Sequence, residues 1–456
     1  MLRVSKIEHD GKIIELLPEN KLFSDKNTYT VLVGKNGLGK SRLLTNIAKS
    51  QTRNIYDVDD LYDSASPNCS IDRTPLVIAV STSPFDKFPT PRGKRNANPN
   101  NYRYVGMRGE GLFSASSAVS LISSASKGLL NKLLNQQNNA NLIDAFKSLS
   151  FLPSISFIFK PAFFRYTEKW DSKNIPVHYA RIESDDLSDT LMLDERYAKN
   201  FNSLATEIKS TAKYAMSNLA DYFTERKALS LDVDFMTNEC FLDGNLTHSH
   251  IIHSIQILMD VGLVRLIDLQ LHKEGFGELN LRKASSGEQC LIVLMLGIAG
   301  HIENGSLILI DEPEISLHPR WQEEFMRLLT SAFEGYHHCQ FIIATHSPQV
   351  ISRLNTSDSY IYSFSKEALY ESNYFNNKSA DFQLAELFDA PGLMNEYISR
   401  VSFNLIAKLR TRKKVDSEIH EELQKLLEMQ IQLSPHDPTI QLIDSVRELY
   451  YYYASN

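Results

Sequence analysis

The positions of apolar and polar residues predict a hairpin, two strands and a helix in the first part of the chain. Apolar and polar residues alternate in 2–8 and 12–16 around an Asp-Gly pair, which is typical of a β-hairpin. The β-rich run 29–33 precedes a segment with apolar residues at helical spacing, and 76–80 is a further apolar run. We therefore expect the order hairpin, strand, helix, strand.

Two uninterrupted aliphatic runs, 307–310 and 340–344, lie in the second half of the chain. Aliphatic residues without alternation suit central parallel strands that are covered on both faces. Strands that alternate with helices predict an α/β fold with a mostly parallel sheet. Helices are expected at 290–301 and 320–333, and a hairpin is expected from 263–271 and 278–281.

The middle and the end of the chain have mainly helical patterns. Residues 114–152 show helical apolar spacing with a break near 136–139, and 194–226 are predicted to form one long helix with a polar face. We expect these segments to form a helical arm or lid inserted between two halves of the sheet. We expect the tyrosines at 450–453 either to dock on a partner or another subunit, or to pack on the chain's own helices. Further helices are expected at 382–387, 395–409 and 418–432.

Composition and charge narrow the class of protein. The chain has 456 residues, enough for two or three folding units, and a net charge of −7, so no global field draws it onto nucleic acid. Its four cysteines lie far apart without a CxxC pair, which is typical of cytoplasmic thiols and argues against a zinc site or a disulfide framework. No apolar run has membrane-spanning length. We expect a soluble cytoplasmic protein that makes no membrane contact.

A glycine-rich loop, GKNGLGKS, follows the first predicted strand after the hairpin. Strand, GxxxxGKS and helix together are the context of a phosphate-binding P-loop. The glycines let backbone N–H groups surround the phosphates, and the helix N-terminus adds the positive end of its dipole. Lys40 is expected to reach the β- and γ-phosphates, and Ser41 is expected to bind Mg²⁺. The candidate nucleotide-binding residues are Gly34, Asn36, Gly37, Gly39, Lys40, Ser41 and Arg42.

Candidate catalytic residues follow the two buried strands. Asp311 and Glu312 stand at the C-terminal end of the run 307–310, where ligands bind in open α/β sheets. Asp311 can hold a hydrated Mg²⁺, and Glu312 can orient or deprotonate a water molecule. His346 follows the next strand, from which it can contact the γ-phosphate; the alternative is an ordinary core histidine. We expect Glu312, His346 and Lys40 to be the catalytic residues.

Two clusters with metal-ligand side chains are better explained without a metal. The aspartates of the first cluster are expected to belong to a solvated loop. The histidines of the second have no carboxylate or cysteine partner nearby in sequence, so ordinary surface and core positions are favoured over metal binding. The clusters are Asp57, Asp59 and Asp60, and His248, His250 and His253.

Residues 87–108 form a basic segment with Pro, Gly and Asn and with interleaved tyrosines. Arginines beside aromatic residues suit a nucleic-acid backbone, while a flexible surface loop is the favoured alternative. DNA is therefore an open candidate partner. The residues concerned are Arg92, Lys94, Arg95, Tyr102, Arg103, Tyr104 and Arg108.

Taken together, these segments resemble the ABC-type ATPase head of SMC, RecF, RecN and OLD proteins. Residues 34–41 resemble the Walker A loop, 307–312 Walker B with its catalytic glutamate, and 314–318 the D-loop. Residues 285–289 stand where that family has its LSGGQ signature, and His346 stands where it has a switch histidine. The resemblance implies a mixed, mostly parallel sheet with helices on both faces and N-terminal antiparallel strands.

The resemblance also implies how the ATP site is completed. Heads of this family pair head to tail, so that the signature of one covers the nucleotide on the P-loop of the other. Ser286, Gly287 and Glu288 would then contact ATP across a homodimer or a higher even oligomer. Mg²⁺ would be held by Ser41 and Asp311. No glutamine occupies a clear Q-loop position, since the strand 76–80 is followed by Ser-Thr-Ser.

Within that family the chain most resembles the PtuA ATPases of Septu and retron-linked antiphage systems. EISLHP after the Walker B carboxylates is characteristic of the OLD-like branch, and VIAVSTSPFDKFP resembles the PtuA group. OLD nucleases carry a C-terminal TOPRIM domain with a D-x-D motif, which has no match after His346. The chain is therefore not expected to cut DNA itself. The resemblance implies a separate HNH endonuclease, which the C-terminal helical region would bind.

Three functions compete at this point. The first is a regulatory ATPase with a separate nuclease, the second is a DNA-repair or chromosome-organising ATPase that clamps DNA, and the third is a self-contained nuclease. The predicted helices are too short and interrupted for an SMC-type coiled coil, which counts against the second. The expected domains are a P-loop half at 1–110, a helical arm with a strand segment at 111–262, a signature and Walker B half at 263–365, and a helical docking region at 366–456.

Overall fold

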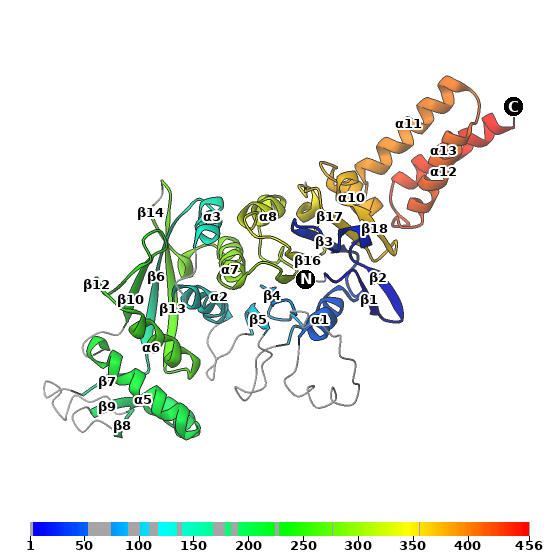
Figure 1. Cartoon of the computed structure of the whole chain (residues 1–456). Helices are drawn as coiled ribbons and strands as arrows, with labels where there is room; N and C mark the ends of the chain where they lie inside the picture. The colour runs from blue at the N-terminus through cyan, green and yellow to red at the C-terminus, as the bar shows by residue number, and fades with distance from the viewer. Residues whose placement is uncertain are drawn as a thin grey trace, which may run out of the picture.

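The chain forms two large β-sheets with helices between them and a helical unit that projects at the C-terminal end (Figure 1). The predicted aspartate cluster and the basic residues Arg92, Lys94 and Arg95 lie outside the described residues. In this computed structural model the described residues are 3–52, 74–89, 101–108, 117–134, 139–166, 178–183, 190–223, 228–275, 277–354 and 356–455.

The main sheet has seven strands in the order β18-β17-β3-β16-β15-β4-β5. All neighbours from β17 to β5 run parallel, and only β18 is antiparallel. The predicted α/β fold with a mixed, mostly parallel sheet is therefore confirmed. The strands are β3 (Thr28–Val33), β4 (Val77–Ser81), β5 (Tyr102–Gly106), β15 (Leu307–Asp311), β16 (Gln340–Thr345), β17 (Ser359–Ser363) and β18 (Ala368–Glu371).

The aliphatic runs of the central strands are buried on both sides of this sheet. Consecutive residues of a strand point to opposite faces, so Leu309 packs with α1 while Ile308 and Ile310 join the core on the other face. On the first face lie α1 (Lys40–Gln51) and the predicted hairpin of β1 (Lys6–His9) and β2 (Lys12–Glu15). The opposite face is covered by α2 (Ser117–Leu134), α3 (Ala140–Ser148), α7 (Ser286–His301) and α8 (Pro319–Ala332), and the short α9 (Pro348–Ile351) packs on α8.

A second sheet lies on the far side of α2, α3 and α7 (Figure 1). Its six strands are antiparallel in the order β12-β11-β10-β6-β13-β14, and β6 at its centre pairs with both β10 and β13. A smaller three-stranded sheet has the order β7-β9-β8. The strands are β6 (Phe151–Pro161), β7 (Phe163–Arg165), β8 (Tyr179–Glu183), β9 (Thr190–Asp194), β10 (Leu229–Asp234), β11 (Glu239–Leu242), β12 (Asn245–Leu246), β13 (Val264–Lys273) and β14 (Gly277–Asn280).

These sheets correct two expectations. The helical arm with one strand segment that was expected at 111–262 contains the whole of β6 to β12. Strand β13 continues the same sheet beyond the expected boundary, because it pairs with β6. The single helix expected at 194–226 is interrupted, since Asp194 caps a short helix that ends before a second one begins. The helices of this region are α4 (Glu195–Asn202), α5 (Thr206–Ala220) and α6 (Ser249–Asp260).

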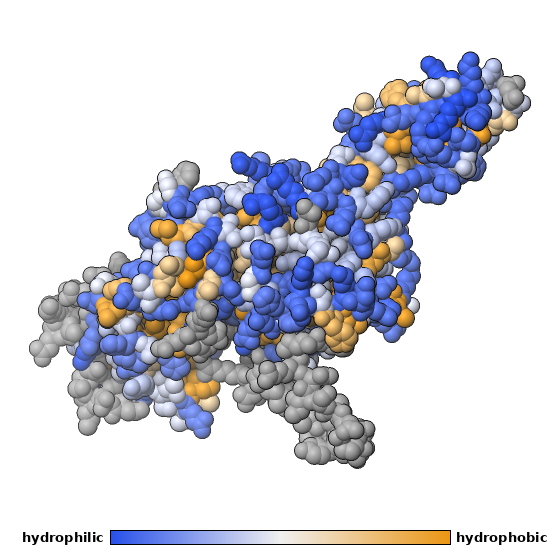
Figure 2. Space-filling view, turned by 45° about the horizontal axis from the view of Figure 1, so that its top comes forward, coloured by the Kyte–Doolittle hydropathy of each residue, from blue (hydrophilic) through white to orange (hydrophobic). Residues whose placement is uncertain are grey.

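The C-terminal helices form a unit with a core of their own. Three of them pack on one another around a cluster that includes Leu405, Leu426 and Val446, and Figure 1 shows them projecting from the main sheet. Apolar residues lie scattered among hydrophilic ones on this unit (Figure 2). None of the helices in the described ranges is long and apolar enough to cross a membrane. The helices are α10 (Ala380–Glu386), α11 (Glu396–Arg412), α12 (Ser417–Gln430) and α13 (Thr439–Ala454).

Candidate nucleotide-binding site

The P-loop connects β3 to α1 at the carboxyl edge of the main sheet. Gly34, Gly37 and Gly39 have φ values of 148°, 85° and 95°, which L side chains rarely adopt. A Cβ on Gly39 would lie 2.9 Å from His9 Nε2, so the N-terminal hairpin packs directly on this part of the loop. Asn36 and Gly37 are exposed at its outer turn. The chain thus forms the backbone-lined loop that its motif predicts.

Lys40 is buried at the start of α1 and points back over the P-loop. Its Nζ donates to the backbone oxygens of Gly34 (2.7 Å) and Lys35 (2.9 Å) and lies 3.1 Å from His346 Nδ1. Burial lowers the pKa of Lys40 to about 8, and the neighbouring carboxylates partly oppose this shift. A buried ammonium gains from a nearby phosphate anion, so the lysine favours a phosphate ligand.

Ser41 and Asp311 meet between α1 and the end of β15. The Ser41 hydroxyl donates to Asp311 Oδ1 at 2.9 Å. Asp311 is 3% exposed, and burial raises its pKa to about 7 although the Ser41 hydroxyl lowers it. Hydroxyl and carboxylate oxygens are ligands that Mg²⁺ prefers, and a divalent cation would compensate the buried charge. The pair therefore fits the predicted magnesium site.

Glu312 and His346 face each other across neighbouring strand ends. The backbone of Glu312 is left-handed, with φ 50°, and its N–H donates to Ala344 O at 2.9 Å. Glu312 Oε1 lies 3.1 Å from His346 Nε2, and this contact lowers the pKa of the carboxyl. On its other side the ring reaches Gly34 O at 3.1 Å through Nδ1. The histidine thus links the candidate water-orienting carboxylate to the P-loop.

Glu314 is a third carboxylate beside the site, to which sequence reasoning assigned no separate role. Its Oε1 accepts a hydrogen bond of 2.6 Å from the backbone N–H of His346, while Oε2 is buried and has no hydrogen-bond partner among the residues that the structure describes. Burial raises the pKa of Glu314. The carboxylate holds the backbone of the turn that carries the His346 ring. The only sign of this residue in the sequence was a second glutamate two residues after Glu312. Its position indicates no role until the fold is known.

The signature turn begins α7. The helix starts at Ser286, four residues before the predicted start, because Ser285 caps it: the Glu288 N–H donates to Ser285 Oγ at 3.4 Å and that hydroxyl donates to Glu288 Oε2 at 2.9 Å. A Cβ on Gly287 would lie 3.0 Å from Ser316 O, so the turn packs on the D-loop. Among the described residues, none of the hydrogen bonds or ion pairs of 286–288 reaches the P-loop of the same chain.

The Arg42 guanidinium lies beside the P-loop, because a Cβ on Gly39 would be 3.2 Å from its Nη2. The guanidinium donates to Asp10 Oδ2 at 2.7 Å in the N-terminal hairpin, and both side chains are more than half exposed. The side chain therefore ties α1 to the hairpin next to Gly39 of the P-loop.

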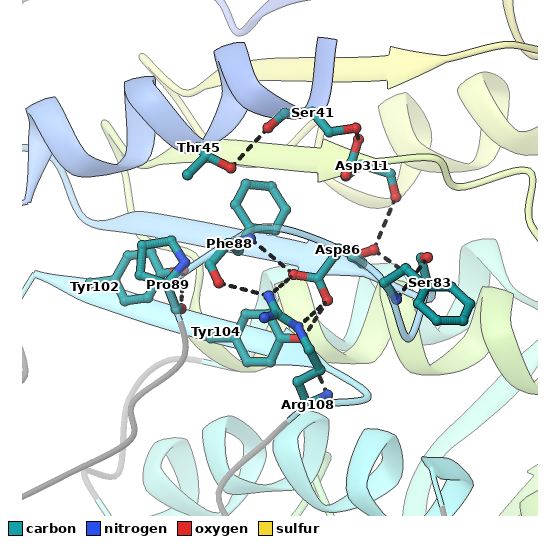
Figure 3. A network of polar contacts seen from close by, with 12 residues as sticks. Ser41, Thr45, Ser83, Asp86, Phe88, Pro89, Tyr102, Tyr104, Arg108 and Asp311 are labelled. Atoms are coloured by element: carbon teal, nitrogen blue, oxygen red, sulfur yellow. Dashed lines mark hydrogen bonds and ion pairs between the residues drawn. The ribbon is translucent and has the colours of Figure 1, made fainter. Parts of the chain in front are cut away.

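A buried polar network adjoins the magnesium candidate (Figure 3). The Asp86 carboxylate, which has no exposed side-chain surface, accepts from Tyr104 Oη at 2.8 Å and from Arg108 Nε at 3.1 Å. Burial is the main cause that raises the pKa of Tyr104. One strand over, the Ser81 hydroxyl donates to Asp311 O at 3.3 Å. The segment after β4 is therefore anchored beside the Walker B strand.

This network corrects part of the predicted basic loop. Residues Tyr102–Gly106 form strand β5, and Tyr102 and Tyr104 are only 8% and 7% exposed. Arg108 is paired with Asp86 inside the protein. These three side chains serve internal packing, because parallel pairing with β4 draws the segment into the sheet. Sequence alone did not reveal this pairing.

The predicted histidine cluster lies at the start of α6. His248, His250 and His253 are exposed, and the rings of His248 and His250 stack at 5.9 Å. Within the described ranges no group of three His, Cys, Asp or Glu side chains is arranged to hold a metal ion. The interpretation of these histidines as ordinary surface and core residues stays a prediction.

The comparisons with known sequences support an ATPase. Residues 137–352 match a protein-family model described as "AAA domain, putative AbiEii toxin, Type IV TA system". The matched segment starts after the P-loop and includes the signature turn, Asp311 and His346. It supports an ATPase.

Two curated relatives agree with that result. "Retron Ec83 probable ATPase" from Escherichia coli is 25% identical over 391 residues, which cover 74% of this chain and 67% of that protein. "Retron Vc95 probable ATPase" from Vibrio cholerae serotype O1 biovar El Tor is 28% identical over 148 residues, 29% of this chain and 28% of that protein. The chain thus spans about two thirds of the first relative and under a third of the second.

Two solved structures show remote similarity. "SMC head domain from Thermotoga maritima" has a TM-score of 0.18 and 18% identity, covering 29% of this chain and 64% of that chain. "Crystal structure of the SmcHead bound to the C-winged helix domain of ScpA" has a TM-score of 0.18 and 9% identity, covering 65% and 88%.

Proposed function

We propose that this chain binds and hydrolyses ATP and regulates a partner within an antiphage defence complex. The observation that carries the proposal is the grouping of Lys40, Ser41, Asp311, Glu312 and His346 on adjacent strand ends. Contacts of 2.9 to 3.1 Å join Ser41 to Asp311, Lys40 to His346 and His346 to Glu312. A cation, a hydroxyl-carboxylate pair and an ionised carboxylate are the groups that phosphoryl transfer requires.

Each side chain has a role in the proposed reaction. Lys40 exchanges its contacts with backbone oxygens for the phosphates of ATP. Ser41 and Asp311 hold Mg²⁺, which, when bound, screens the charge of the phosphate oxygens. Glu312 is ionised because the contact with His346 lowers its pKa, and it accepts a hydrogen bond from the attacking water. Positioning and charge stabilisation of this kind carry most of phosphoryl-transfer catalysis.

A second copy of the chain completes the proposed site. The signature turn packs on its own D-loop, and none of its described contacts reaches its own P-loop. Head-to-tail pairing would bring Ser286, Gly287 and Glu288 of each copy over the ATP of the other. The proposed assembly is a homodimer or a higher even oligomer, whose state follows the supply of ATP.

The proposed partner is a separate HNH endonuclease that binds the C-terminal helices. Two relatives carry names of retron ATPases, and the α11–α13 unit projects with its own core, which suits a docking module. The alternative is an ATPase that clamps DNA. A neighbouring reading frame whose product has the residue spacing of an HNH nuclease would favour the proposal of a separate endonuclease partner. An ATPase rate that DNA raises without such a partner would favour the alternative, and nicking of plasmid by the pure chain would favour a self-contained nuclease.

Glu312→Gln tests the ATPase assignment. The amide keeps the size of the side chain but cannot take a proton, so ATP binding is expected to persist while turnover falls about 10²–10⁴-fold. Titration calorimetry and phosphate release measure the two effects, and light scattering reports an ATP-bound dimer. Glu421→Gln, at an exposed position of α12, is the matched control. Turnover at the wild-type rate in Glu312→Gln would remove Glu312 from the water-orienting role.

A further inference from the structure

The turn 345–347 carries the His346 ring into the candidate site. Thr345 is the last residue of β16, and Ser347 caps the short helix α9, because its Oγ accepts from the Gln349 N–H at 3.2 Å. Within the turn, the Ser347 N–H donates to Thr345 Oγ1 at 3.0 Å. Both ends of the turn are therefore fixed, and the position of the ring depends on the backbone of His346 between them.

The His346 ring has contacts on two sides that leave it little freedom. Its Nδ1 lies 3.1 Å from Lys40 Nζ and 3.1 Å from Gly34 O, and its Nε2 lies 3.1 Å from Glu312 Oε1. A shift of the ring by about 1 Å would lengthen the contacts on one side beyond hydrogen-bond distance. Misplacement of that size at a reacting centre can lower a rate on the order of 100-fold.

Glu314 holds the backbone of His346 from outside the turn. Its Oε1 accepts from the His346 N–H at 2.6 Å, and the Thr345 hydroxyl contacts the same carboxyl group. The loop that presents Glu314 is itself anchored. The Leu317 N–H donates to Glu314 O at 3.0 Å, and the D-loop packs on Gly287 of the signature turn. The carboxyl group therefore transmits a fixed position to the turn.

We propose that Glu314 is a positioning residue for ATP hydrolysis, which acts by fixing the His346 ring against Glu312 and the P-loop. This inference rests on the proposed function, because it assigns a part in that reaction. The alternative is a second water-orienting carboxylate beside Glu312. The geometry favours positioning, since Oε1 is occupied by the His346 N–H and Oε2 is buried, where no water molecule reaches it.

Positioning requires a hydrogen-bond acceptor at Oε1 rather than a charge. Burial raises the pKa of Glu314, and the hydrogen bonds from the His346 backbone and the Thr345 hydroxyl oppose that shift. Glu314→Gln keeps the shape and the acceptor and removes the charge. Glu314→Met fills a similar volume without an acceptor. The two variants therefore separate the hydrogen bond from the packing of the side chain.

We expect the rate of ATP hydrolysis to fall about 10- to 100-fold in Glu314→Met, with little change in the Kd for ATP. Glu314→Gln should hydrolyse ATP at a rate close to that of the wild type. In a His346→Ala background, Glu314→Met should cause no further loss, because a residue that acts through the ring has no effect once the ring is absent. Glu334→Met, at an exposed position before β16, is the matched control and should leave the rate unchanged.

The experiment measures phosphate release in single turnovers, with protein in excess over MgATP, so that slow rates remain measurable. Titration calorimetry gives the Kd for ATP, and thermal melting shows that each variant is folded. Glu314→Ala is a second variant without an acceptor and takes the place of Glu314→Met if the latter does not fold.

The outcomes separate positioning from the other roles. A slow Glu314→Met, a Glu314→Gln close to the wild type and no further loss in the His346→Ala background would together support the proposal. A rate in Glu314→Gln as low as in Glu314→Met would indicate a direct part in the chemistry and overturn it. Full additivity with His346→Ala, a wild-type rate in Glu314→Met or in His346→Ala, or loss of ATP binding in both variants without an acceptor would also overturn it. Each of these results leaves the ATPase standing, whereas a wild-type chain that does not hydrolyse ATP would remove both proposals.

Discussion

The buried lysine of the P-loop makes nucleotide affinity depend on pH. Lys40 has a pKa of about 8 in the nucleotide-free protein, because burial disfavours its ammonium form. Phosphate oxygens favour that form, so the bound state keeps Lys40 charged over the whole range of the assay. Above pH 8 the free protein must take up a proton to bind, and affinity falls as pH rises.

The magnitude follows from this linkage. Between pH 7.5 and 9.5 the charged fraction of a group with a pKa of about 8 falls roughly 25-fold, so the Kd for ATP should rise by about that factor, close to 2 kcal/mol. The pH range of the assay starts above the second pKa of a phosphate group, which is about 6. Titration of ATP itself therefore contributes little to the change in Kd. EDTA in the buffer removes Mg²⁺, so competition between Mg²⁺ and protons at Asp311 does not add to the pH dependence.

Fluorescence titration with ATP at several pH values measures the effect. Lys40→Arg is the control, because a guanidinium stays charged through pH 9.5 and should give a nearly flat profile. Lys40→Met should bind ATP weakly at every pH. A flat profile in the wild type would refute the reasoning, since it would mean that burial does not lower the pKa of Lys40. An equal slope in Lys40→Arg would place the titrating group elsewhere.

Two further predictions concern stability. Asp311 has a folded pKa of about 7 against an ordinary value of 3.8, so its contribution to folding is full below about pH 4 and is lost as pH rises through 7. Asp311→Asn should raise the free energy of unfolding at pH 8 by roughly 1–3 kcal/mol. It should also flatten the dependence of that free energy on pH between pH 5 and 8, as measured by urea unfolding without nucleotide. An unchanged pH profile would contradict this prediction. Arg108→Met leaves the Asp86 carboxylate buried without its cation. We expect the free energy of unfolding to fall by about 3 kcal/mol, which is the low end of the range for a buried ion pair because the Arg108 side chain is 28% exposed. Adding Asp86→Asn should recover part of that loss, and strict additivity in the double variant would show that the pair is not coupled.

Several elements could be predicted because their signals are local. The hairpin around Asp10 and Gly11, the P-loop and the strand β15 each depend on residues within about ten positions of one another. Period-2 alternation, a glycine pattern and an aliphatic run report burial directly. For this reason the sequence also identified Asp311 and Glu312 as strand-end carboxylates.

Other elements were missed because their partners are distant in sequence. In β6, Ile155 pairs with Val233 on one side and with Leu271 on the other, and no local pattern selects those partners. The segment that looked like a basic loop becomes β5 because it pairs with β4. Loop closure over such separations is governed by the whole fold rather than by local propensity.

By itself, the sequence determined which residues carry the phosphate and carboxylate chemistry and on which kinds of element they stand. Only the tertiary structure decided which of them meet. Ser41 and Asp311 are 270 positions apart, and Lys40 and His346 are 306 apart, yet parallel pairing of β3, β16 and β15 brings both pairs together at one edge. The same packing gave Glu314 its place under His346. Burial and neighbours set these properties, and both are products of contacts between segments far apart in the chain.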